Sequence, residues 1–177
     1  SSLKMHALVE GLLRLSRAGR DTLYMEAIDM NLMTQHVLDT LAFQIQKSKV
    51  QVNLEKPMAD CYGDRNQLNQ VFSNLLDNAI KYRDAERPLT ITISSRVEGR
   101  KATYTVADTG IGIAPEDQEK IWILFHRIAK DEAIPGEGLG LTLVHRVVER
   151  HGGRVWVESE VGVGSRFYVE LPVDSGQ

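Results

Sequence analysis

Residues 74–82, with the sequence NLLDNAIKY, are the most informative stretch of the chain. They close a predicted helix that begins after Asp64, a good N-cap residue, and runs to about Tyr82. One side of this helix is apolar, and a row of polar residues runs beside it at steps of three and four. This row consists of Gln67, Gln70, Asn74, Asn78 and Lys81. Asn is a poor helix former, so Asn74 and Asn78 in mid-helix require a reason. They are either a pair of hydrogen-bonding amides or a floor beneath a polyphosphate, where an amide oxygen ligates a hard cation such as Mg²⁺.

Two glycine-rich stretches follow along the chain. Residues 108–113 (DTGIGI) come directly after a predicted strand, and their glycines permit positive φ and close approach to a ligand. The Asp108 carboxylate can accept a hydrogen bond from an exocyclic amine, which adenine has and guanine replaces with a carbonyl. Residues 136–141 (GEGLGL) precede a predicted helix whose free N–H groups form an anion site. Neither stretch is a Rossmann fingerprint or a P-loop, and each by itself is a weak signal.

The remaining elements define the fold class. Helical periodicity covers residues 3–17, 31–49 and 141–151, whereas residues 50–55, 89–97, 101–106, 154–160 and 165–171 alternate as strands. This order predicts an α/β (α+β) two-layer sandwich, in which a mixed, mostly antiparallel sheet of about five strands carries about three helices on one face.

The composition excludes several classes of protein. The 177 residues are 42% hydrophobic and carry a net charge of −3, which predicts one core and argues against a nucleic-acid partner. A single cysteine, Cys61, excludes a disulfide framework and multi-cysteine metal sites. No apolar run approaches the roughly 20 residues that span a bilayer, and no signal-peptide pattern is present. We therefore expect a cytoplasmic domain, with membrane anchoring of a longer protein left open.

Taken together and in order, the motifs resemble the histidine-kinase branch of the GHKL ATP-binding superfamily, the Bergerat fold. Residues 74–82 resemble its N box and residues 108–113 its first glycine box. Residues 121–127 (IWILFHR) resemble its F box, and residues 136–141 its second glycine box. The resemblance covers about residues 20–177.

The resemblance implies a site for ATP and Mg²⁺. Asn78 would ligate the metal, Asn74, Lys81 and Arg127 would be the catalytic set, and Asp108 would bind the adenine amine. A lid would span about residues 114–135, anchored by Trp122, Leu124 and Phe125. The residues that the resemblance assigns to the nucleotide are Asn74, Asn78, Lys81, Tyr82, Asp108, Gly110, Gly112, Ile113, Arg127, Gly136, Gly138, Leu139, Gly140 and Leu141.

Asn74 bears on the type of reaction. The hydrolytic branches of the superfamily have Glu at the corresponding position, where it activates water, and an amide is no general base. The resemblance thus implies a kinase that holds ATP and passes its γ-phosphoryl group to a histidine on a helical hairpin, for relay to a response-regulator aspartate. None of the five histidines here precedes Glu or Asp, so the acceptor is expected outside this chain. Alternatives are a GHKL-type Ser/Thr kinase and a silent nucleotide-binding docking module. Glu137 stands where the family more often has Thr or Ser, and this difference is the reason for retaining the silent module as an alternative.

The N-terminal helix suggests the domain organisation. Residues 1–19 resemble the end of the dimerisation hairpin's second helix, followed by a linker at 20–30 and the ATP-binding domain at 31–177. The seam of Met5, Leu8, Leu12 and Leu15 either continues a longer bundle or packs on its own domain. The expected partners are the phosphoacceptor hairpin of the same protein, a response regulator and, in the full-length protein, a second copy.

Overall fold

The structure is a computed structural model that describes residues 2–123 and 139–176. Its helices are α1 Ser2–Arg20, α2 Met30–Thr40, α3 Ala42–Lys47, α4 Arg65–Lys81 and α5 Gly140–Arg150, with a 3₁₀ turn η1 at Pro115–Asp117. Its strands are β1 Met25–Ile28, β2 Gln51–Leu54, β3 Cys61–Asp64, β4 Thr90–Glu98, β5 Lys101–Asp108, β6 Arg154–Glu160 and β7 Gly164–Pro172.

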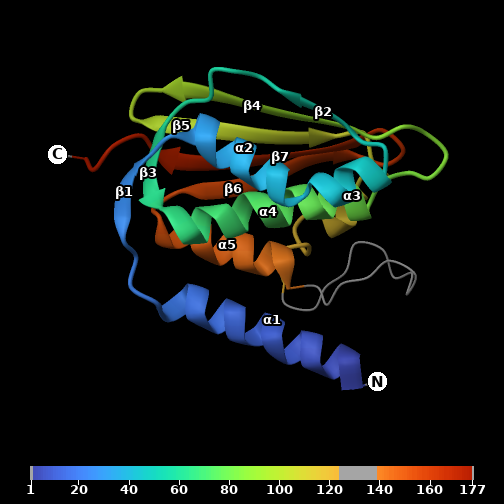
Figure 1. The fold of residues 1–177 in the computed structure, drawn as a ribbon, viewed down its shortest axis with the longest axis horizontal. Coiled ribbons are helices and arrows are strands. Elements are labelled where there is room, and N and C mark those ends of the chain that lie inside the picture. The colour runs from blue at the N-terminus through green and yellow to red at the C-terminus, as the bar shows by residue number, and fades with distance from the viewer. Residues whose placement is uncertain (1, 124–138, 177) are drawn as a thin grey trace.

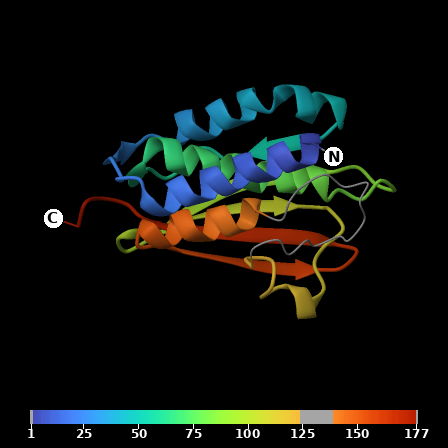
Figure 2. The ribbon, with the colours of Figure 1, turned by 90° about the horizontal axis from the view of Figure 1, so that it is seen from below.

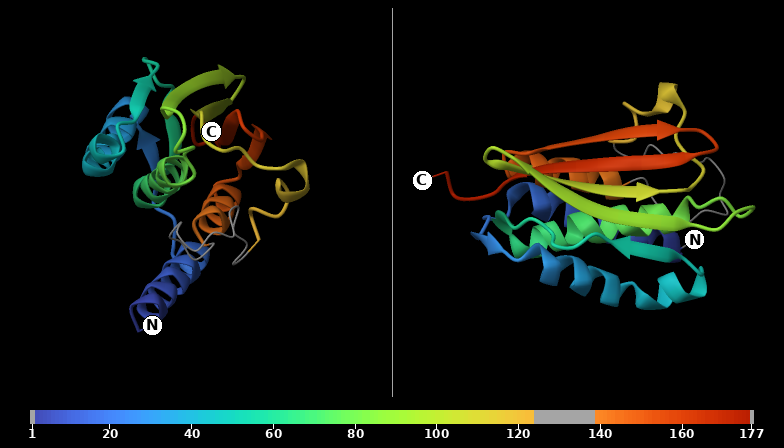
Figure 3. Two further views of the ribbon diagram at one scale, coloured as in Figure 1. Left: turned by 90° about the vertical axis from the view of Figure 1, so that its right-hand side faces the viewer. Right: turned by 90° about the horizontal axis from the view of Figure 1, so that it is seen from above.

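The architecture confirms the predicted two-layer sandwich (Figure 1). Five strands form one mixed sheet in the order β2-β4-β5-β7-β6, in which only β2 and β4 run parallel. The helices α2, α4 and α5 lie along one side of this sheet, as the end-on view shows (Figure 3). Alternation along the strands places buried side chains such as Ile91, Tyr104 and Val169 toward the helices.

The central helix α4 forms as the sequence predicts. Asp64 is its N-cap, and its carboxylate accepts the N–H of Gln67 at 3.0 Å. The apolar side of the helix is fully buried, and Phe72 meets Tyr104 of β5 edge to face at 5.6 Å between ring centroids. Of the polar row, Gln67 is buried, whereas Gln70, Asn74, Asn78 and Lys81 are half-buried.

One local prediction was wrong, and the structure adds a strand inside the segment predicted as a linker. Residues 31–49 form two helices, because Leu41 leaves helical dihedral angles (φ −96°, ψ 10°) while its side chain stays buried. Residues 20–30 contain β1, which pairs antiparallel with β3 so that Ile28 lies opposite Cys61. Each of these strands has four residues, and together they form one small separate sheet that joins distant segments of the chain. Unlike residues 50–55, the stretches 25–28 (MEAI) and 61–64 (CYGD) lack a regular alternation of apolar and polar residues, so they carry no strand signal in the sequence.

The apolar seam of α1 is buried only toward its C-terminal end. Its C-terminal half packs on α5, where Leu15 and Ala18 are buried (Figures 1 and 2). Arg150 of α5 donates hydrogen bonds to the carbonyl oxygens of Ala18 at 2.5 Å and Asp21 at 2.7 Å. The apolar side chains that α1 leaves exposed are Leu3, Met5, Val9, Leu12 and Leu13. In the described part of the chain, no helix combines the length and apolarity that crossing a membrane requires.

Candidate functional site

The polar row of α4 faces the beginning of α5. The Asn74 amide nitrogen donates to the carbonyl oxygen of Gln70 at 2.7 Å, which directs the amide oxygen away from its own helix turn. A methyl group on Gly140 would stand 3.0 Å from that oxygen. The fold therefore brings the N box and the last glycine of the second glycine box side by side, although 66 positions separate Asn74 from Gly140 in the sequence.

The second half of the N box borders the first glycine box. Asn78 and Tyr82 line one small cavity together with Asp108, residues 111–113 and Phe167. Its volume is about 20 Å³, close to the space of one water molecule, so a purine needs the surrounding groups to move apart. Lys81, predicted to neutralise phosphate charge, forms an ion pair with Asp77 at 2.9 Å.

Asp108 is the last residue of β5, and its carboxylate is held from two sides. One oxygen accepts the N–H of Gly110 at 2.9 Å. Burial raises the pKa of this carboxyl, and the main-chain N–H groups of Gly110 and Ser165, followed by the charge of Arg87, offset part of that rise. A desolvated carboxylate gains much from a donor on a ligand, which suits it to an exocyclic amine.

The glycines of the first box are required by the protein's own packing. Gly112 has φ +78°, and a side chain there would overlap the main chain of Glu160 in β6. A Cβ on Gly110 would lie 2.6 Å from the carbonyl oxygen of Tyr82. The sequence predicts positive φ and close approach of a ligand for these glycines, and Gly112 confirms the positive φ. In this structure they let the loop pack between the end of α4 and the β6–β7 hairpin.

The beginning of α5 presents main-chain N–H groups that have no acceptor within the helix. Leu139 is the N-cap, and no side chain among the described residues caps the helix through it. The first hydrogen bond into the helix runs from the N–H of Leu143 to the oxygen of Leu139 at 3.0 Å. The N–H groups of Gly140, Leu141 and Thr142 therefore have no helical acceptor. The Leu139 and Leu141 side chains are buried, which anchors this donor group beside Asn74.

Several predicted site residues lie outside the described residues. They are Leu124, Phe125, Arg127, Gly136, Glu137 and Gly138. Trp122 of the predicted lid anchor is described. Its ring packs edge to face against the ring of Phe167, with 6.0 Å between the ring centroids, and its centroid lies 5.9 Å from that of the His145 ring.

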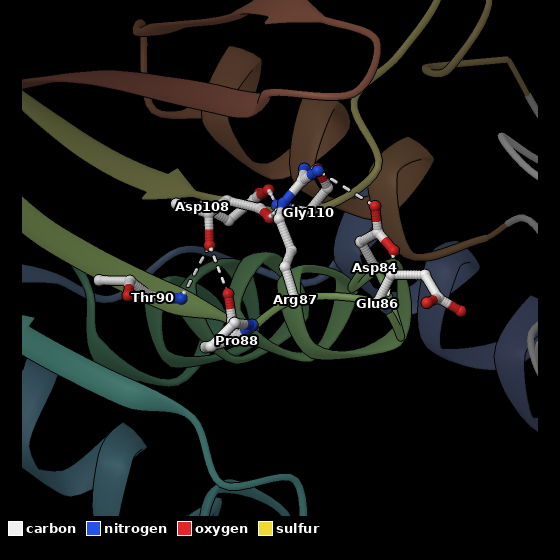
Figure 4. Close-up of polar contacts among 8 residues, drawn as sticks. Asp84, Glu86, Arg87, Pro88, Thr90, Asp108 and Gly110 are labelled. Carbon is white, nitrogen blue, oxygen red and sulfur yellow. Dashed lines mark hydrogen bonds and ion pairs between the residues drawn. The ribbon is translucent and has the colours of Figure 1, made fainter.

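Two groups that sequence reasoning missed hold the first glycine box in place. The Ser159 hydroxyl accepts the N–H of Ile113 at 2.7 Å and contacts the Ser165 hydroxyl at 2.7 Å. Arg87 donates to the main chain on the other side of the same loop (Figure 4). No local sequence signal marks either residue, since both act on segments far away in the chain.

A larger hollow of about 560 Å³ is lined by residues of β4, β5, β6 and β7 and of the turns that follow β5 and β6. Thr92, Glu158, Glu160 and Arg166 are among its lining residues. It reaches the first glycine box at Asp108 and Thr109 but contains no residue of the N box or the second glycine box, and the carboxylates of Glu158 and Glu160 disfavour a polyphosphate. Size alone therefore does not identify the nucleotide site.

Comparisons with known proteins identify the family of this chain. Residues 63–175 match the family described as histidine kinase-, DNA gyrase B-, and HSP90-like ATPase. Cyanobacterial phytochrome B of Nostoc sp. (strain PCC 7120 / SAG 25.82 / UTEX 2576) is 38% identical over 170 residues, covering 95% of this chain and 22% of that protein.

Two solved structures have a similar fold. Full-length ShkA in complex with AMPPNP has a TM-score of 0.80 and 28% identity, over 96% of this chain and 36% of ShkA. Histidine kinase ThkA in complex with the response regulator protein TrrA has a TM-score of 0.77 and 25% identity, over 97% of this chain and 48% of that chain.

The chain belongs to the histidine kinase-, DNA gyrase B- and HSP90-like ATPase family. Within that family it is a catalytic domain of the histidine-kinase type. It spans 22% of the length of the phytochrome relative, so it corresponds to one part of that longer protein.

Proposed function

We propose that this chain binds Mg-ATP and donates the γ-phosphoryl group to a histidine on a helical hairpin, for relay to a response-regulator aspartate. The observation that carries the proposal is the meeting of three groups at one end of the sandwich. These are the amide row of α4, the desolvated Asp108 carboxylate and the start of α5 beside Asn74. The bound AMPPNP reported for ShkA supports the assignment of the nucleotide.

Each group has a chemical task in this proposal. The Asp108 carboxylate accepts a hydrogen bond from the adenine amine, and Tyr82 lies against the base or ribose. The N–H groups from Gly140 to Thr142 donate to phosphate oxygens, where the helix dipole adds favourable charge. Lys81 leaves its ion pair with Asp77 and pairs with a phosphate oxygen instead. Arg127, outside the described residues, supplies charge at the γ-phosphate.

Asn78 suits the Mg²⁺ ion that accompanies ATP. Among the described residues, no group of three or more His, Cys, Asp or Glu side chains could hold a metal. Mg²⁺ needs only one or two ligands from the protein, because water molecules and substrate phosphate oxygens supply its other ligands. When bound, it neutralises charge that develops on the phosphates.

The transfer step needs positioning more than protein acid–base chemistry. An imidazole nitrogen of the acceptor histidine attacks the γ-phosphorus, the bond to the β–γ bridging oxygen breaks, and ADP leaves with the electron pair. Asn74 cannot take a proton from water, so the site holds ATP without hydrolysing it quickly. Rapid ATP turnover by the purified chain that Asn74→Ala abolishes would contradict this role.

The expected partners follow from the exposed apolar side of α1 and from the complex of ThkA with a response regulator. In this proposal α1 is the end of the hairpin's second helix, and its exposed Leu3, Met5 and Val9 pack on the remainder of the hairpin, whose second copy makes the homodimer. The separation into a helix at 1–19, a linker at 20–30 and a catalytic domain at 31–177 belongs to the same proposal.

Two measurements test the function. Calorimetric titration with AMPPNP, with and without Mg²⁺, should show 1:1 binding that Mg²⁺ strengthens. Mixing the chain with the phosphoacceptor hairpin of the same protein and γ-labelled ATP should then place acid-labile label on histidine. Label on Ser or Thr would support the alternative kinase, binding without transfer would support a silent docking module, and no binding would refute the nucleotide site.

A further inference from the structure

Arg87 lies in the connection between α4 and β4, and its guanidinium reaches the loop after β5. Its Nε donates to the carbonyl oxygen of Thr109 at 3.0 Å, and one terminal nitrogen donates to the carbonyl oxygen of Gly110. The other terminal nitrogen pairs with the Asp84 carboxylate at 3.1 Å. Figure 4 shows the side chain between Asp84 and Gly110, with Asp108 beside it. All three nitrogens are thus engaged, two of them with the first glycine box.

The same connection holds the loop at further points. The Thr109 hydroxyl accepts the N–H of Thr90 at 2.9 Å and contacts the Pro88 carbonyl oxygen at 3.3 Å. The N–H of Thr109 donates to the Thr90 oxygen at 3.2 Å. The N–H of Ile111 donates to the Tyr82 oxygen at 3.0 Å. The loop therefore takes its shape from the segment that follows the N box.

Peptide geometry connects Arg87 to Asp108. The peptide bond between Thr109 and Gly110 is trans, so its C=O and N–H point in opposite directions within one plane. Arg87 holds the C=O of Thr109 on one side of the loop, and the N–H of Gly110 consequently points to the other side. There it donates to the Asp108 carboxylate at 2.9 Å. Releasing the carbonyl would let this peptide plane rotate and would free the carboxylate to rotate with it.

We propose that Arg87 is a positioning residue for base recognition: by holding the Thr109 and Gly110 carbonyls, it fixes the Asp108 carboxylate in the orientation that selects adenine. This inference rests on the proposed nucleotide site and adds a determinant of its selectivity. Arg87 itself touches neither nucleotide nor phosphate in this scheme. Its positive charge also lowers the pKa of the Asp108 carboxyl, which favours the ionised, accepting form.

The geometry requires arginine at this position. A guanidinium is planar and presents its donors as a rigid fork, so it can bridge two adjacent carbonyls while it pairs with Asp84. A lysine ammonium keeps the charge but is a compact group that cannot reproduce the fork. Arg87→Lys should therefore retain part of the electrostatic effect and lose the constraint on the peptide plane.

The test compares an adenine with a guanine nucleotide on the intact chain. AMPPNP and GMPPNP affinities are measured by calorimetry, or by competition where binding is weak, for the wild type, Arg87→Met, Arg87→Lys and Arg100→Met. Arg100 is the matched control, because it pairs with Asp174 at 2.6 Å on the surface and touches no site residue. Arg87→Met should weaken AMPPNP binding about tenfold, the loss of roughly one hydrogen bond to a charged group. Its GMPPNP affinity should stay the same, so that discrimination falls.

The outcomes are distinguishable from one another. Arg87→Lys should fall between Arg87→Met and the wild type, and Arg100→Met should match the wild type. If Arg87→Met loses thermal stability but keeps the wild-type ratio of the two affinities, Arg87 is only structural and the proposal is wrong. If Arg87→Met does not fold, Arg87→Lys decides, since an unchanged ratio in that variant also refutes it. If the wild type binds neither nucleotide, the proposed function itself fails.

Discussion

The Asp108→Asn substitution tests how the site recognises its base. The amide oxygen of the introduced side chain can still accept the N–H of Gly110, which now lies 2.9 Å from the carboxylate, so the loop keeps its hydrogen bond. The negative charge is lost, and the NH₂ group of the amide then faces the position proposed for the adenine amine. Because burial raises the pKa of Asp108, the fold disfavours the ionised form, and the neutral amide removes that cost. We therefore expect the variant to be as stable as the wild type or slightly more stable.

The expected loss of binding follows from the kind of hydrogen bond removed. A hydrogen bond to a charged group contributes about 1.5–3 kcal/mol, which corresponds to roughly 10–150-fold in affinity for AMPPNP. The amide can donate to a carbonyl, so GMPPNP binding should improve in the same variant. The assay is calorimetric titration of both nucleotides alongside thermal unfolding.

Asp174→Asn is the matched control. Asp174 is a surface carboxylate that pairs with Arg100, and its replacement should leave both affinities unchanged. An Asp108→Asn variant that unfolds like the wild type and binds AMPPNP within about twofold of it would refute the assignment of Asp108 to the base, because losing the charged acceptor should cost at least tenfold.

Three further predictions concern stability and docking. Burial lowers the pKa of His151 below its ordinary value of 6.5, and its Nε2 accepts the N–H of Asp64, so the folded state holds it neutral. Stability should therefore decrease as the pH falls through 6.5, by up to about 1.4 kcal/mol per pH unit, and denaturant unfolding of His151→Gln should show a smaller dependence on pH. Gly112→Ala should destabilise by clearly more than the about 1 kcal/mol expected for Gly99→Ala, because both glycines have positive φ but only Gly112 faces a main-chain overlap; equal unfolding midpoints would contradict this. Arg150→Met should release the C-terminal end of α1, seen as faster amide hydrogen exchange there with little change in α4; unchanged exchange in α1 would show that apolar packing suffices.

Much of the fold was predictable because its determinants are local. The apolar stripe of α4, the Asp64 cap and the alternation in β4, β5, β6 and β7 each arise within a few consecutive residues. These patterns were enough to predict a mixed sheet with helices on one face. They were not enough to predict β1 and β3, whose four-residue strands exist only because they pair with each other.

Some residues of the candidate site could likewise be predicted from the sequence, and others could not. Asn74, Asn78, Asp108 and Gly140 stood out in the sequence because amides in mid-helix and glycines at short spacing are locally unusual. Arg87 carries no such signal, and a surface arginine before a proline is unremarkable.

The sequence by itself determined the order of the motifs, the class of fold and the residue types available for binding a nucleotide, since these depend on side-chain chemistry and short-range periodicity. Only the tertiary structure decided that Asn74 faces Gly140, that Arg87 holds the loop of Asp108, and that α1 docks on α5 through Arg150. Each of these contacts joins groups separated by 20 residues or more in the chain. Their geometry is set by how α4, α5 and the sheet pack together, and no window of sequence contains that information.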